Sequence, residues 1–202
     1  NETAEGYLEV LERQSNRLKK LIEDLIEASK ASTGNLAVHL EKLEAGVSVV
    51  QIVGEFEDKL NAADLTLLIQ KPETPVYVMA DGRHFWRVID NLMNNICKYA
   101  QPGTRVYVDL RENGGQVELI FRNTSRYPLN ISSEELMERF VRGDESRNTE
   151  GSGLGISIAK SLMELMGGSF MLYVDGDLFK VVLGFAQMEE EKEPLDENKS
   201  GK

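Results

Sequence analysis

The feature of this sequence that most limits its fold is a long segment without proline near its start, from Glu5 to Lys30. Apolar side chains recur there at alternating spacings of three and four residues, with serines completing the pattern: Leu8, Leu11, Ser15, Leu18, Ile22, Leu25 and Ser29. This periodicity predicts one helix of roughly 40 Å, at about 1.5 Å per residue. Because its apolar stripe needs cover, the helix requires a partner in a coiled coil or a bundle. Gly34 stands where the helix is expected to end.

After Leu36 the sequence changes to short strands that alternate with helices. Two pairs of alternating segments flank turns that contain glycine and predict hairpins: 105–111 with 116–121, and 170–174 with 179–185. A further strand is predicted at 75–80, and helices at 81–99, 134–140 and 156–166, the first of them capped by Asp81. The segment 47–53 fits either a strand or the start of a helix.

The composition excludes several classes of function. With 34 acidic and 23 basic residues, the chain carries a formal net charge of −11. It lacks the broad positive surface of a nucleic-acid binder, so we expect no nucleic-acid partner. Its single cysteine, Cys97, excludes an intrachain disulfide and a zinc site built on several thiolates. There is no run of 18 apolar residues, and the first residues do not resemble a signal peptide. The acidic segment 188–202 is almost free of apolar residues, and we expect it to be disordered.

One face of the predicted helix at 81–99 carries an unusual row of side chains. Asn91, Asn95 and Lys98 are spaced four and three residues apart, so they share this face, while Val88, Leu92 and Ile96 line the opposite one. Asparagine is a poor helix former, so such a row is uncommon on a purely structural helix. Two interpretations stay open for the row alone. It is a solvated polar face, or an asparagine oxygen helps to coordinate Mg²⁺ together with substrate phosphates.

A segment rich in glycine stands directly before the predicted helix at 156–166: Gly151, Ser152, Gly153, Leu154 and Gly155. Alone, such a segment most often forms only a turn. Glycines at such a place also let backbone N–H groups approach phosphate oxygens, and the helix N-terminus adds a favourable partial charge. No Gly-Lys-Ser/Thr follows, as in a Walker A loop, and no strand directly precedes, as in a dinucleotide-binding fold. The long polar stretch 127–150 before it is typical of a mobile lid.

Together these motifs resemble the ATP-binding catalytic domain of sensor histidine kinases, within the ATPase superfamily that includes gyrase, Hsp90 and MutL. Residues 91–99 are similar to the N box, residues 138–142 to the F box and residues 149–160 to the G2 box, in the same order and at a similar spacing. The resemblance covers about residues 1–186. It implies an α+β fold, in which a mixed sheet of about five strands is covered on one face by helices. The result is a two-layer α/β sandwich preceded by one long helix.

The resemblance also implies a division of the chain into three parts. Residues 1–34 would be the second helix of a dimerisation and phosphotransfer hairpin whose first helix is absent from the sequence. Residues 35–187 would be the catalytic ATP-binding domain, and residues 188–202 the acidic tail. The parent protein would form a homodimer through its dimerisation helices. It would be anchored in a bacterial cell membrane, with this part in the cytoplasm.

The N box implies roles for four residues toward ATP and Mg²⁺. Asn95 would be the Mg²⁺ ligand, and Asn91 would line the phosphate pocket. Lys98 would reach the phosphates, and Tyr99 would flank the nucleotide. Relatives that hydrolyse ATP carry a glutamate where Asn91 stands, and asparagine cannot accept a proton from water. This difference favours phosphoryl transfer to a protein over hydrolysis.

The other boxes imply the remaining contacts with the nucleotide. Residues 151–155 would cradle the triphosphate, while Phe140 and Arg142 would anchor and complete the lid, Arg142 with a catalytic role. In one place the sequence departs from the family. The G1 box supplies an aspartate and glycines near residue 123, where this chain has Asn123 and no glycine. The Asn123 oxygen can still accept a hydrogen bond from the adenine amine, without the help of a charge.

Neither histidine stands in the His-Glu/Asp-x-x-x-Pro helix that carries the phosphoacceptor of such kinases. His39 is expected on a surface strand and His84 in a solvated first turn of the helix at 81–99. The chain is therefore expected to bind Mg-ATP without phosphorylating itself. It would pass the γ-phosphoryl to a histidine outside these residues, for relay to a cognate response regulator. Two alternatives remain: a kinase-like interaction module that binds no nucleotide, and an ATP hydrolase or serine-protein kinase of the same superfamily.

Overall fold

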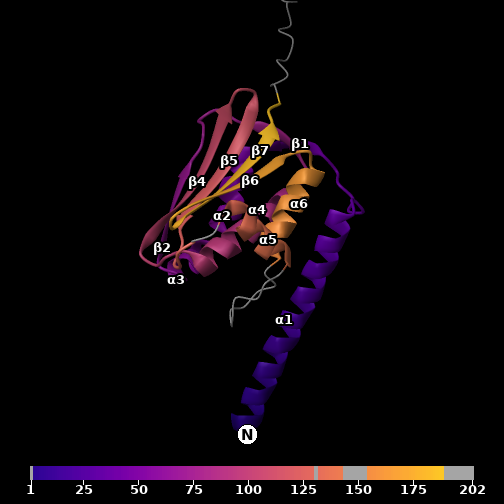
Figure 1. Ribbon diagram of the computed structural model, residues 1–202, viewed down its shortest axis with the longest axis vertical. Coiled ribbons are helices and arrows are strands. Elements are labelled where there is room, and N and C mark those ends of the chain that lie inside the picture. The colour runs from indigo at the N-terminus through magenta and orange to yellow at the C-terminus, as the bar shows by residue number, and fades with distance from the viewer. Residues whose placement is uncertain (1, 130–131, 143–153, 189–202) are drawn as a thin grey trace, which may run out of the picture.

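The computed structural model describes residues 2–129, 132–142 and 154–188 (Figure 1). The chain begins with helix α1, Glu2–Ser32, which projects well beyond the rest of the molecule. The predicted long helix is therefore confirmed, and it ends as expected, with Gly34 in the left-handed region at φ 69°. Most of its apolar stripe is exposed, including Leu11 at 65% and Leu25 at 61%. Among the described residues, no helix combines the length and the apolar character needed to cross a bilayer.

A five-stranded mixed sheet forms one layer of the remaining structure. Its strand order is β2-β4-β5-β7-β6, with β2 parallel to β4 and every other neighbouring pair antiparallel. The strands are β2 (Leu65–Gln70), β4 (Thr104–Asn113), β5 (Gln116–Thr124), β6 (Ser169–Asp175) and β7 (Leu178–Ala186). Both predicted hairpins are confirmed, because β4 pairs with β5 and β6 with β7. A separate two-stranded sheet pairs β1 (Glu41–Glu44) with β3 (Tyr77–Ala80).

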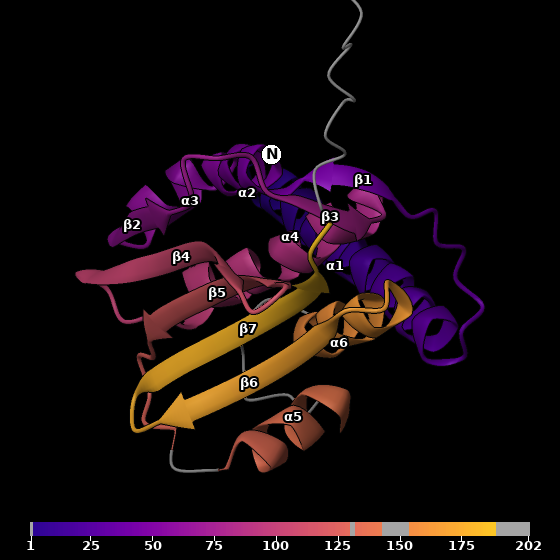
Figure 2. The same ribbon diagram turned by 90° about the horizontal axis from the view of Figure 1, so that it is seen from above.

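Helices cover one face of the large sheet, as seen from above in Figure 2. They are α2 (Ala45–Gly54), α3 (Glu57–Ala62), α4 (Gly82–Tyr99), α5 (Ser133–Arg142) and α6 (Gly155–Leu165). A single core joins the two layers, since alternate side chains of β5 and β7 are buried together with the apolar faces of α2, α4 and α6. The predicted α+β fold, a two-layer sandwich with a five-stranded mixed sheet after a long helix, is confirmed.

The segment 47–53, which fits a strand or a helix by its sequence, lies within helix α2. The carboxylate of Glu44 decides between them, because it accepts hydrogen bonds from the backbone N–H groups of Gly46 and Val47 and so caps the helix. A side chain at the end of β1 therefore starts α2 directly.

Both expectations for the histidines need correction. His39 is exposed as predicted, but it lies before β1 and not on a strand. His84 is buried, not solvated, with 9% of the residue exposed. Its ring Nε2 lies 2.9 Å from the carbonyl oxygen of Ala37, because the segment between α1 and β1 passes over the first turn of α4. A pattern within one helix does not show that a distant segment covers it.

Candidate functional site

Helix α4 presents the row of asparagines predicted from the sequence. Its N-cap is Asp81, whose carboxylate accepts hydrogen bonds from the N–H groups of Arg83 at 3.0 Å and His84 at 3.3 Å. One face enters the core and is almost fully buried: Val88, Ile89, Leu92 and Ile96. Asn91, Asn95 and Lys98 lie half-buried outside that face. The predicted division of the helix into an apolar and a polar face is confirmed.

The carboxylate of Asp81 has a third hydrogen-bond donor, which comes from outside the helix. It also accepts the backbone N–H of His39 at 2.9 Å. Burial alone would raise the pKa of Asp81, but the N–H groups of His39, His84 and Arg83 and the His84 ring hold the pKa below its ordinary value. Since the folded pKa is lower than the unfolded one, this stabilisation is present above the unfolded pKa of about 3.9 and is lost as the pH falls through the folded pKa.

We expect Asp81→Ala to lower the free energy of unfolding by about 1–2 kcal/mol at pH 7, because the helix loses its cap. Asp81→Asn keeps an oxygen acceptor and should lose less, but part of the weakening of the parent chain below about pH 4 should disappear. Denaturant midpoints at pH 7, 4.5 and 3 measure both effects. An acid dependence in Asp81→Asn equal to that of the parent chain would contradict this assignment.

The first turn of α6 lies against Asn91. A Cβ atom added at Gly155 would lie 3.2 Å from Asn91 Oδ1, so the absence of a side chain at Gly155 allows the two helices to approach each other here. The Nδ2 atom of Asn91 is buried and has no hydrogen-bond partner among the described residues. The polar face of α4 and the end of the glycine segment therefore meet. Leu154 is half-buried next to this contact, and Gly151, Ser152 and Gly153 lie outside the described residues.

Asn123 stands at the end of β5 with an unsatisfied acceptor. The residue is 4% exposed, and its Oδ1 atom is buried without a hydrogen-bond partner among the described residues. Its Nδ2 group donates to the carbonyl oxygen of Thr124 at 3.3 Å, so the acceptor oxygen points away from that bond. An unsatisfied buried polar atom costs about 1–3 kcal/mol. Such an atom is accommodated best where a ligand supplies the missing donor.

Backbone hydrogen bonds hold the end of β5 to the end of α4. The Thr124 oxygen accepts the N–H of Gln101 at 2.9 Å, and the Tyr99 oxygen accepts the N–H of Arg126 at 2.8 Å. In the last turn of α4, the Lys98 ammonium lies 4.7 Å from the centre of the Tyr99 ring. The end of α4, which carries Lys98 and Tyr99, is therefore held close to the end of β5, which carries Asn123.

The two predicted lid residues belong to helix α5. It packs against α6 and β6, and Leu136 on it is buried in the core. Phe140 and Arg142 belong to the last turn of α5. The side chains of residues 138–142, and the whole of residues 143–153, lie outside what the structure describes, so the predicted contacts of the lid stay predictions. The acidic tail from residue 189 onward also lies outside it.

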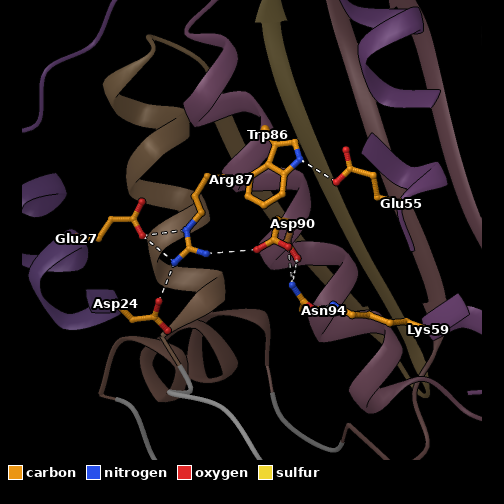
Figure 3. A network of polar contacts seen from close by, with 8 residues as sticks. All are labelled: Asp24, Glu27, Glu55, Lys59, Trp86, Arg87, Asp90 and Asn94. Carbon is orange, nitrogen blue, oxygen red and sulfur yellow. Dashed lines mark hydrogen bonds and ion pairs between the residues drawn. The ribbon is translucent and has the colours of Figure 1, made fainter. Parts of the chain in front are cut away.

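The third asparagine of α4, Asn94, is turned toward other partners. Its Nδ2 group donates to the backbone oxygen and to Oδ1 of Asp90, each at 2.8 Å, and its Oδ1 accepts from Lys59 Nζ at 3.0 Å (Figure 3). The carboxamide of Asn94 is therefore occupied by contacts with Asp90 and Lys59, although Asn94 is next to Asn95 in the sequence.

Few donor groups for a metal ion lie close together in the part of the chain that the structure describes. No cluster of three or more histidine, cysteine, aspartate or glutamate side chains that could hold a metal ion occurs in the described part of the chain. The half-buried amide of Asn95 offers one neutral oxygen. This set fits Mg²⁺, which keeps several water ligands and usually binds jointly with substrate phosphates, better than a metal held by protein ligands alone.

Comparison with known proteins identifies a family for most of the second half of the chain. The sequence model described as histidine kinase-, DNA gyrase B- and HSP90-like ATPase matches residues 80–194. Sensor protein IrlS of Burkholderia pseudomallei is 27% identical over 173 residues, covering 83% of this chain and 36% of that protein. Sensor protein kinase WalK of Staphylococcus aureus is 26% identical over 172 residues, covering 83% and 41%. The chain thus spans less than half the length of these relatives.

Solved structures share the fold. Histidine kinase AdeS of Acinetobacter baumannii superposes with a TM-score of 0.71 at 20% identity, over 90% of this chain and 84% of that one. Full-length ShkA in complex with AMPPNP gives a TM-score of 0.75 at 16% identity, over 92% and 40%. Histidine kinase ThkA, solved in complex with the response regulator protein TrrA, gives 0.68 at 16% identity, over 95% and 53%. At these identities the likeness shows the fold.

Proposed function

Since this chain belongs to the family of histidine kinase-, DNA gyrase B- and HSP90-like ATPases, we propose that it is the ATP-binding catalytic part of a sensor histidine kinase. It transfers the γ-phosphoryl group of ATP to a histidine outside these residues. The observation that carries the choice of transferase over hydrolase is the carboxamide of Asn91 beside Gly155. A carboxamide at this position does not act as a general base toward water, so an acceptor other than water is favoured.

The proposed roles follow from the contacts that α4 makes with α6 and with the end of β5. The oxygen of Asn95 is one Mg²⁺ ligand, and the amide of Asn91 faces the phosphates with its unpaired Nδ2 donor. Lys98 supplies positive charge to the phosphates, and the Tyr99 ring flanks the nucleotide. Asn95 would hold Mg²⁺ together with the phosphates, and the ion would supply positive charge for phosphoryl transfer.

The base of the nucleotide is assigned to Asn123. Its buried oxygen lacks a donor, and the exocyclic amine of adenine is a donor of the required kind. The hydrogen bond from Asn123 to Thr124 fixes the amide so that the oxygen, not the NH₂ group, is the free atom. This arrangement supports adenine recognition without the aspartate of the G1 box.

The proposed division of the chain extends this function to the parent protein. Residues 1–34 are assigned to the second helix of a dimerisation and phosphotransfer hairpin, residues 35–187 to the catalytic domain and residues 188–202 to the tail. The exposed apolar side chains of α1 support a helical partner and a homodimer. A response regulator as the next acceptor is supported by the complex of ThkA with TrrA, which shares this fold. We place the parent in a bacterial membrane, with these residues in the cytoplasm.

Calorimetry and radiolabelled ATP test the proposal on the 202-residue chain. We expect one molecule of Mg-ATP to bind per chain, negligible release of inorganic phosphate, and no label retained on the chain from [γ-³²P]ATP. Continuous phosphate release would identify a hydrolase, and absence of binding would identify an interaction module. Stable label on His39 or His84 would contradict the assignment of the acceptor to residues outside this chain.

A further inference from the structure

A small pocket lies between α2 and the first turns of α4, on a part of α4 that has no role in the proposed nucleotide site. Its volume is about 180 Å³. Residues of both helices line this α2–α4 pocket, among them Ser48, Gln51, Ile52, Glu55, Phe85 and Trp86. Ile52 and Phe85 are buried, so the pocket has an apolar part that continues into the core.

An indole ring and a carboxylate lie side by side at this pocket. Trp86 Nε1 donates a hydrogen bond to Oε2 of Glu55 at 3.3 Å, and both side chains are exposed (Figure 3). The bond uses the edge of the ring, which leaves the ring face and the other carboxylate oxygen for a ligand. A ring face beside a carboxylate is a combination that attracts an ammonium or guanidinium group.

The charge of the pocket is negative. Among the described residues that line it, Glu55 alone is charged. Two basic residues are next in sequence to lining residues, but each has another partner. Lys42 Nζ lies 4.4 Å from the centre of the Tyr77 ring, and Arg83 Nε lies 3.8 Å from Oδ1 of Asp81. A cationic group from outside therefore complements the charge of the pocket.

The size of the pocket favours a single side chain over a whole small molecule. Pockets for cofactors and similar ligands measure about 300–1,000 Å³, which is clearly more than this one. Lysine and arginine combine an aliphatic stem with a charged head. The stem matches the apolar contribution of Ile52 and Phe85, and the head matches Glu55 and the Trp86 ring.

Helix α2 indicates that the occupant belongs to a polypeptide. No residue of Ala45–Gly54 is charged, yet Val47 and Val50 are 63% and 41% exposed. The exposed face of a surface helix normally carries charged or polar residues, and grouped apolar side chains there mark interaction sites. Gln51 is one turn from both Val47 and Glu55, so this face adjoins the pocket. A free small cation would leave the valines uncovered.

We propose that the α2–α4 pocket is a docking site for a partner protein, which inserts one lysine or arginine side chain beside Trp86 and Glu55. Apolar residues that flank this basic residue in the partner cover the exposed valines of α2. The docking site uses the contact of α4 with α2, whereas the proposed nucleotide site uses the contact of Asn91 with Gly155 of α6. The two proposals can therefore be tested separately.

The fluorescence of Trp86 tests this inference, because Trp86 is the single tryptophan of the chain and lies at the pocket. The probe is leucyl-arginyl-leucine, blocked at both ends. We expect a saturable change in emission with this peptide. Leucyl-citrullyl-leucine, in which a neutral urea group replaces the guanidinium, should bind about fivefold more weakly because it lacks the charge. N-acetyl-arginine amide should also bind more weakly, because it lacks the apolar flanks.

Two variants with the same change of net charge locate the effect. Glu55→Gln keeps an oxygen acceptor for Trp86 Nε1 but removes the carboxylate, so it should bind the arginine and citrulline peptides equally. Glu57→Gln removes an exposed carboxylate that does not line the pocket, and should keep the preference of the parent for arginine. Circular dichroism and Mg-ATP titration verify that each variant remains folded.

The docking site is overturned if neither peptide gives a saturable change, or if the parent binds both peptides equally. It is also overturned if Glu57→Gln loses the preference as Glu55→Gln does, since the acidity of the whole chain would then explain it. Equal affinity for N-acetyl-arginine amide would identify a free small cation as the occupant, and an emission spectrum that changes on dilution of the chain alone would identify a second copy; either result overturns the proposed partner. Failure of Mg-ATP to bind would instead count against the proposed function and would leave the peptide titrations intact.

Discussion

Replacing Asn95 with alanine is expected to weaken binding of Mg-ATP by about 100-fold, which corresponds to ~2.8 kcal/mol. The change removes the single neutral oxygen that α4 is proposed to give to the metal ion. Asn95 is half-buried and lies outside the apolar face of the helix, so the fold should tolerate the substitution. Isothermal titration calorimetry of the parent and the variant with Mg-ATP measures the effect.

The metal dependence of this loss separates ligation from other roles of Asn95. In EDTA, where ATP carries no Mg²⁺, the parent and Asn95→Ala should bind ATP with nearly equal, weak affinity. A loss of equal size with and without Mg²⁺ would show that Asn95 contacts the nucleotide directly, and unchanged affinity for Mg-ATP would remove it from the site.

Asn94→Ala is the matched control for this experiment. It removes the same carboxamide one residue earlier on the same helix, but the Asn94 carboxamide is already engaged with Asp90 and Lys59. Its loss should lower stability by about 1 kcal/mol for the hydrogen bonds removed and should leave the affinity for Mg-ATP within about twofold. The contrast between the two adjacent asparagines therefore tests whether Asn95, and not Asn94, contributes to Mg-ATP binding.

Local sequence was sufficient to predict the elements whose signals lie within a few residues. The cap at Asp81 and the turn between β4 and β5, where Gly114 and Gly115 have φ of 59° and 81°, are examples. The polar and apolar faces of α4 follow from spacing in the same way. The segment 47–53 remained ambiguous because its apolar run carries no period that separates a strand from a helix, and the Glu44 cap decided it.

Contacts between distant segments could not be predicted in this way. His84 is buried by residues nearly fifty positions earlier, and Arg87 is neutralised by acids of α1 about sixty positions earlier. In the sequence Asp24 and Glu27 belong to the charged flank of a long helix, which is typical of a solvated face. Their role requires knowledge of where α1 packs. The same is true of Asn91 and Gly155, which belong to two separate motifs and meet only in the folded structure.

The second large effect is expected in stability, from loss of the aromatic contact that ties α4 to the sheet. Phe85 is 2% exposed, and its ring centre lies 5.6 Å from that of Phe185 on β7, with the rings inclined by 51°. Replacing Phe85 with alanine removes this contact and leaves a cavity between the layers, which costs about 3–5 kcal/mol. For a domain of this size the midpoint of thermal unfolding should fall by about 6–20 °C.

The neighbouring Trp86 provides the comparison that makes this prediction specific. It is an aromatic residue on the same turn of α4, but it is 38% exposed and contacts Glu55 through Nε1 at 3.3 Å. Trp86→Ala should therefore cost clearly less than Phe85→Ala, about 1–2 kcal/mol. Differential scanning calorimetry and urea denaturation give the two values. Equal losses would mean that the Phe85–Phe185 contact does not anchor the helix. A larger loss of stability in Phe85→Ala than in Trp86→Ala would show that the core contact beneath α4 stabilises the helix that carries Asn91 and Asn95.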